Sequence, residues 1–130
     1  MFRLAYDNAG GRTMGNAMQV PVTAGEEYCI GEALVINSGK ATKCGATAKP
    51  THMCVRDQAA DREENVLVYP ISSTMVFETR FTEVPTSVNV GDKVTVANDG
   101  LGITATTDGG VCEIVDILDM TVSGRALVKF

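Results

Sequence analysis

The sequence predicts an all-β protein: a small β-barrel or sandwich of short antiparallel strands with a loosely repeated hairpin unit and an extended N-terminal arm. The chain has 130 residues, the length of a single domain with one buried core. Its 13 glycines, its many Thr and Val residues and its turn signals about every 8 to 12 residues favour strands over helices. Because Trp is absent and aromatic residues make up only 5%, we expect an aliphatic core.

The hairpin unit occurs twice, in residues 31–39 and 91–100. Each copy contains a Gly-acid turn, a short apolar strand and a second turn rich in Asn, Ser, Asp and Gly. Glycine adopts turn conformations that are closed to other residues, so these glycines mark strand boundaries. Each copy is followed by a Thr/Ala-rich segment and an apolar–Cys pair: residues 40–48 with Met53-Cys54, and residues 101–107 with Val111-Cys112. The repeat indicates the architecture of the fold and identifies no catalytic or binding residue.

Residues 1–25 are expected to form an arm outside a single β-barrel domain of residues 26–130. Apolar side chains alternate along the start of this arm as they do in a strand, and glycines at positions 10, 11 and 15 interrupt any longer element. Such an arm would contact a partner through Phe2, Arg3, Leu4 and Tyr6. The same alternation leaves a second interpretation open, in which residues 2–6 form the first strand of the barrel itself.

Short strands are expected through the first half of the domain, at residues 26–30, 33–36, 51–56, 65–69 and 74–81. The last of these has the clearest alternation. Met75, Phe77, Thr79 and Phe81 share one face, and Val76, Glu78 and Arg80 share the other. This pattern predicts a half-buried antiparallel strand.

The remaining segments complete the predicted sheet. Residues 57–64 are mostly charged and too few for a stable helix, so we expect a solvated bulge there. Residues 111–118 are apolar on both faces except at Glu113 and Asp116, which predicts a strand near the middle of a sheet. Residues 121–130 should close the chain as a strand, after a turn or bulge at residues 123–124.

The charge and hydropathy of the chain exclude two classes of partner. Sixteen acidic residues against 11 basic ones give a net charge of −5, and the basic residues are scattered singly, so a nucleic-acid partner is not expected. No apolar run approaches the roughly 18 to 20 residues that cross a bilayer. Residues 1–15 lack the apolar core of a secretory signal. We expect a protein made in the cytoplasm, with neither nucleic acid nor a membrane as partner.

The four cysteines are predicted to be buried thiols. Cys29, Cys44, Cys54 and Cys112 form no close-spaced pair, and a reducing cytoplasm would keep them free. In an oxidising setting two disulfides could form, and the sequence leaves three pairings open.

No catalytic or metal-binding set can be assembled from the sequence. His52 and Cys54 would share a face of a strand, but a zinc site needs two further ligands, and the other cysteines are isolated. A core thiol beside a surface histidine is the preferred interpretation. The carboxylates of residues 57–64 lack the spacing of a calcium loop, and no Gly-rich phosphate loop is present. We therefore expect no enzyme, no cofactor and no metal.

The turn-and-strand pattern resembles the capsid decoration, or cement, proteins of tailed bacteriophages. The resemblance covers roughly residues 20–130 and rests on five segments: Gly25-Glu26, residues 31–35, residues 90–96 with the Thr-rich hairpin after them, residues 110–112 and residues 125–130. It implies a structural protein on the capsid exterior of a virion, assembled in the bacterial cytoplasm, often trimeric at three-fold positions of the shell. Its partner would be the major capsid protein, which it would clamp against internal DNA pressure.

Two other functions remain open from the sequence. One is a different phage β-module, such as a tail-tube, connector or fibre-associated domain. The other is a stand-alone domain that binds protein or carbohydrate. Sugar stacking needs exposed aromatic rings, and the chain has three tyrosines and no Trp.

Overall fold

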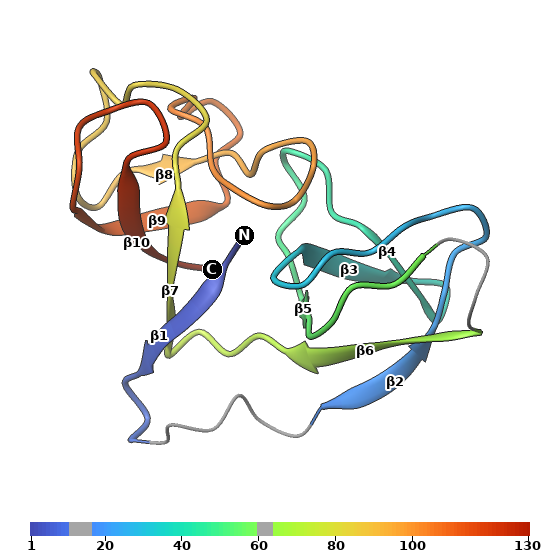
Figure 1. Ribbon diagram of the computed structural model, residues 1–130. Coiled ribbons are helices and arrows are strands. Elements are labelled where there is room, and N and C mark those ends of the chain that lie inside the picture. Colours follow the sequence, from blue (N-terminus) through green and yellow to red (C-terminus); the bar gives the residue numbers. More distant parts are fainter. Residues whose placement is uncertain (11–16, 60–63) are drawn as a thin grey trace.

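The computed structural model describes residues 1–10, 17–59 and 64–130, which form ten strands and no helix (Figure 1). Sheet A has the strand order β1-β7-β10-β9-β8 and sheet B the order β2-β6-β5-β3-β4. All neighbouring strands are antiparallel. The strands are β1 (Arg3–Asp7), β2 (Met18–Pro21), β3 (Ala33–Asn37), β4 (Lys40–Lys43), β5 (His52–Cys54), β6 (Asn65–Pro70), β7 (Met75–Arg80), β8 (Lys93–Val94), β9 (Cys112–Ile117) and β10 (Arg125–Lys129). The all-β prediction is confirmed, and the architecture is a sandwich of two sheets rather than a closed barrel.

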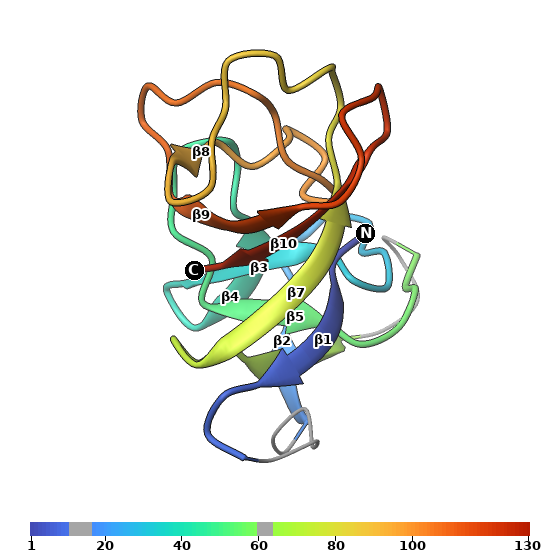
Figure 2. The ribbon, with the colours of Figure 1, turned by 90° about the vertical axis from the view of Figure 1, so that its left-hand side faces the viewer.

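Strand β7 is organised as its alternation predicts. Met75 and Phe77 are buried, whereas Glu78 is half-buried and Arg80 is exposed. Val76, on the predicted outer face, is also buried, so part of that face is covered as well. β7 lies between β1 and β10 (Figure 2), and β10 lies in turn between β7 and β9. The predicted strands at residues 111–118 and 121–130 are therefore both present, in central positions.

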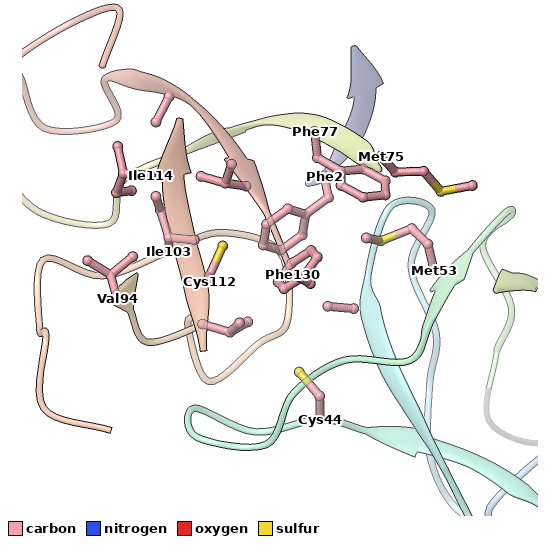
Figure 3. Packing of buried hydrophobic residues seen from close by; sticks show 14 of the residues in the cluster. Phe2, Cys44, Met53, Met75, Phe77, Val94, Ile103, Cys112, Ile114 and Phe130 are labelled. Atoms are coloured by element: carbon pink, nitrogen blue, oxygen red, sulfur yellow. The ribbon is translucent and has the colours of Figure 1, made fainter. Parts of the chain in front are cut away.

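Two apolar clusters hold the sheets in place. The larger lies between sheets A and B, and the rings of Phe2, Phe77 and Phe130 meet at its centre (Figure 3). The Phe2 and Phe130 centroids are 5.4 Å apart, and those of Phe77 and Phe130 are 5.8 Å apart. The core is mainly aliphatic, as expected, although most of the few aromatic rings are buried in it as well. The smaller cluster covers the other face of sheet B and consists of Val20, Tyr28, Leu34, Ala41, Cys54, Val66 and Val68.

The repeated hairpin unit is visible in the backbone. In both copies, the glycines that open and close the unit have positive φ: Gly31 (72°), Gly39 (77°), Gly91 (92°) and Gly100 (71°). In both, the strand after the first turn pairs with the strand that carries the following cysteine, β3 with β5 and β8 with β9. Residues 40–43, expected only as a Thr/Ala-rich segment, form β4 and pair with β3.

The predicted N-terminal arm is wrong for the residues that the structure describes. β1 pairs with β7 in sheet A, β2 pairs with β6 in sheet B, and Phe2 is only 2% exposed. The second interpretation, a first strand within the protein's own sheet, is what the structure shows. Residues 11–16 of the predicted arm and 60–63 of the predicted bulge lie outside the described residues. Within that bulge, Gln58 exchanges two main-chain hydrogen bonds with Tyr28, so this part is built into the body.

Candidate contact surface

Strand β1 forms one edge of sheet A, and among the described residues no strand pairs with its outer side. The register shifts between Leu4 and Tyr6, which marks a bulge of the kind that often occurs on edge strands. Arg3 is held across the sheet by Glu78, with 3.1 Å between the guanidinium and the carboxylate. Edge strands present main-chain donors and acceptors that can pair with another chain. β1 is therefore a candidate contact strand.

An apolar hollow of about 180 Å³ lies beside β1, between the two sheets. Its apolar lining comes from both sheets and the loop before β3: Met1, Leu4, Ile30, Met53, Val55 and Tyr69. Ile30 is 49% exposed at its rim. Such a hollow can take an apolar side chain of a partner.

Three hydrogen bonds donated by main-chain amides fix the wall of this hollow. The Phe2 amide donates to the Gly31 carbonyl (2.9 Å), and the Gly31 amide donates to the Cys54 carbonyl (2.9 Å). The Ile30 amide donates to the Asp57 carboxylate (2.8 Å). A Cβ on residue 31 would lie 2.5 Å from the Phe2 carbonyl oxygen, so only glycine fits here. The glycine of the repeat thus lets β1 approach the loop of sheet B.

The residue after Gly31, Glu32, forms an ion pair with a partly exposed lysine. The Glu32 side chain is fully buried, and its Oε1 is 2.8 Å from Lys43 Nζ. Its Oε2 accepts a hydrogen bond from the Cys29 amide (2.8 Å). Burial lowers the pKa of Lys43, but the hydrogen bond and charge of Glu32 outweigh that effect, so the pKa lies above its ordinary value. Each oxygen of the buried carboxylate therefore has a partner, as a buried charge requires.

Sequence reasoning placed Phe2, Arg3, Leu4 and Tyr6 on a partner surface, and the structure separates them. Arg3 and Tyr6 are exposed on β1, Leu4 is half-buried beside the hollow, and Phe2 belongs to the core. The other side chains of the hollow were missed. They come from segments far apart in the sequence, and only the packing of sheet A on sheet B brings them together.

His52 and Cys54, the alternative metal or catalytic pair, both have structural partners. His52 Nδ1 is 2.9 Å from Thr51 Oγ1, and burial lowers the pKa of the imidazole. The Cys54 thiol donates to the Arg56 carbonyl (3.0 Å), and burial raises its pKa to about 11. A thiol with this pKa is protonated at neutral pH and is a poor nucleophile. In residues 1–10, 17–59 and 64–130, no group of three or more His, Cys, Asp or Glu side chains could hold a metal ion.

The four thiols are expected to differ sharply in reactivity. All are free, but only Cys29 is exposed. Burial raises the pKa of Cys44 and of Cys54 to about 11, and it raises that of Cys112 as well. Titration of the folded protein with a chromogenic disulfide should give one accessible thiol, and denaturant should release the other three.

The substitution Cys29→Ser is the control for this titration. It should abolish the reaction of the folded protein and leave three thiols after unfolding. A second accessible thiol in the folded protein would contradict the burial of Cys44, Cys54 and Cys112.

The fold and this surface define a β-sandwich module in which one of the four edge strands, β1, lies beside an apolar hollow. No family model matches the chain, and no curated protein matches it either. The described residues contain no helix long and apolar enough to span a membrane.

Proposed function

We propose that this chain is a decoration protein of a tailed bacteriophage, which binds the outside of the capsid and stabilises the shell. Its partner is the major capsid protein, and it occupies the lattice as trimers on the virion exterior. The turn-and-strand resemblance and the compact two-sheet body support this role. The observation that carries the proposal is the unpaired edge of β1 next to the apolar hollow, which together fit an extended segment of another protein.

Strand addition gives this contact both affinity and specificity. A capsid segment that pairs with the outer side of β1 gains main-chain hydrogen bonds, and one apolar side chain of that segment fills the hollow. A single contact of this size is weak, but repetition over a lattice makes the coat stable through avidity. The net charge of −5 is compatible with the outer surface of the shell, away from packaged DNA.

A carbohydrate-binding domain is supported less well. Two of the three tyrosines, Tyr28 and Tyr69, are buried, which leaves Tyr6 as the exposed ring. One ring does not make the aromatic platform on which sugars stack.

Copy number in purified particles tests the proposed role. Particles released from the source culture would be purified, and this polypeptide would be quantified against the major shell protein by mass spectrometry. The proposal expects about one copy per shell subunit. A few to some tens of copies would assign the protein to the tail or connector instead, and its absence from particles would overturn a virion role.

The substitution Ile30→Asp should weaken binding to particles that lack this protein by about tenfold or more. A buried Ile side chain contributes about 1.5 to 3 kcal/mol, whereas an Asp places a charge at the rim of an apolar hollow. The matched control is Met120→Asp, because Met120 is 55% exposed in the loop between β9 and β10. Both variants should unfold in urea at the wild-type midpoint. Equal binding by the two variants, or a loss only in Met120→Asp, would show that the capsid contact does not lie beside β1.

A further inference from the structure

A second hollow, of about 320 Å³, shares no residue with the apolar hollow beside β1. It is lined by side chains from β8, β9, β10 and the loop between β4 and β5, among them Lys49, Lys93, Lys129, Glu113, Val111 and Phe130. Three of the 11 basic residues of an acidic chain thus gather around one small space.

Positive charge is in excess at this hollow. Glu113 lies opposite Lys93 on β8 and opposite Lys129 on β10, so the three side chains form one row across sheet A. Lys129 Nζ is 3.2 Å from Glu113 Oε1. Lys49 and Lys93 form no ion pair within the part of the chain that the structure describes. Three lysines and one glutamate therefore line the hollow, so its side chains carry more positive than negative charge.

The main chain makes this hollow a fixed feature of the fold. The Val111 amide donates to the Val94 carbonyl (3.0 Å). A Cβ on residue 110 would lie 2.2 Å from the Lys93 carbonyl oxygen, so Gly110 packs directly on the backbone of β8. Phe130 is buried in the large core cluster and gives the hollow an apolar base. Lys93 and Lys129 therefore lie on strands whose backbone is closely packed. Lys49 lies in the β4–β5 loop, which belongs to sheet B.

We propose that this hollow binds a small, doubly charged oxyanion such as phosphate or a dicarboxylate. Ammonium groups form short, charge-assisted hydrogen bonds to such oxygens. An anion here balances the excess of positive charge and links Lys49, in the β4–β5 loop, to Lys93 on sheet A. The bound anion therefore stabilises the packing of the two sheets. This site is independent of the proposed role on a capsid.

Binding would be measured on the full chain by NMR titration with inorganic phosphate and, separately, with malonate, against sodium chloride at equal ionic strength. The amide resonances of Gly110 and Val111 should shift and saturate with at least one of the two anions. A saturating anion should also raise the melting temperature by about 3 °C or more, since it binds the folded state alone. Which anion saturates distinguishes a phosphate site from a carboxylate site.

The double variant Lys49→Gln/Lys93→Gln should reduce the affinity at least tenfold. The control, Lys40→Gln, removes an exposed lysine of β4 that does not line the hollow and should keep wild-type affinity. If the lysines only formed ion pairs with the acidic groups around them, such as Glu113, neither phosphate nor malonate would differ in its effect from chloride. That result, or an equal loss in the Lys40→Gln control, would overturn the proposal.

Discussion

Replacement of Phe77 by Ala is expected to cost about 3 to 5 kcal/mol of unfolding free energy. Phe77 is fully buried on β7, an inner strand of sheet A, and its ring packs on that of Phe130, which packs in turn on Phe2. The ring therefore connects β1, β7 and the end of the chain. Since a domain of this size is stable by only about 5 to 15 kcal/mol, the variant should lose a large part of its stability. Urea unfolding, monitored by tyrosine fluorescence, measures the change in midpoint.

A surface leucine is the control for Phe77→Ala. Leu118 is exposed where the chain leaves β9, and Leu118→Ala should change stability by no more than about 0.5 kcal/mol. If Phe77→Ala cost less than about 1 kcal/mol, the three rings would not form the centre of the core.

Replacement of Lys43 by Met is expected to cost about 2 to 3 kcal/mol at pH 7, because it leaves the Glu32 carboxylate buried without a counter-charge. The loss is smaller than for a fully buried pair, since the Lys43 side chain is 40% exposed. Met keeps most of the length and packing of Lys. The double variant Glu32→Gln/Lys43→Met removes the charge as well, and it should recover most of the stability. No recovery in the double variant would show that the pair does not hold a buried charge.

Local patterns predicted most of the strands but not the partner of each strand. The strand expected at residues 26–30 is wrong, because these residues form only an isolated bridge between Tyr28 and Gln58. The alternation from Met75 to Phe81 identified β7 because every second side chain enters the core. The same kind of alternation at Phe2 and Leu4 is satisfied equally by a strand in the protein's own sheet or in another protein's sheet. Only the ladder between β1 and β7 decides this, and that ladder joins residues about seventy positions apart in the chain.

The candidate sites depend on contacts that are even less local. The apolar hollow combines Leu4, Ile30 and Tyr69, and the basic hollow combines Lys49, Lys93 and Lys129. In the sequence these lysines are scattered singly, and that scatter, together with the net charge of −5, was the evidence against a nucleic-acid partner. The register of β8, β9 and β10 gathers two of them on one face of sheet A. Cross-strand register is set by tertiary packing and is not contained in any short segment.

The position of β10 between β7 and β9 has a consequence for synthesis on the ribosome. Sheet A has no continuous ladder until residues 125–129 have left the exit tunnel, because β7 on one side and β9 on the other both pair with β10. The inter-sheet core must also wait, since Phe130 closes it against Phe2. Until then, the edges of β7 and β9 are unpaired and prone to associate with other chains. Sheet A and the inter-sheet core therefore gain their native packing only after residues 125–130 have emerged from the ribosome.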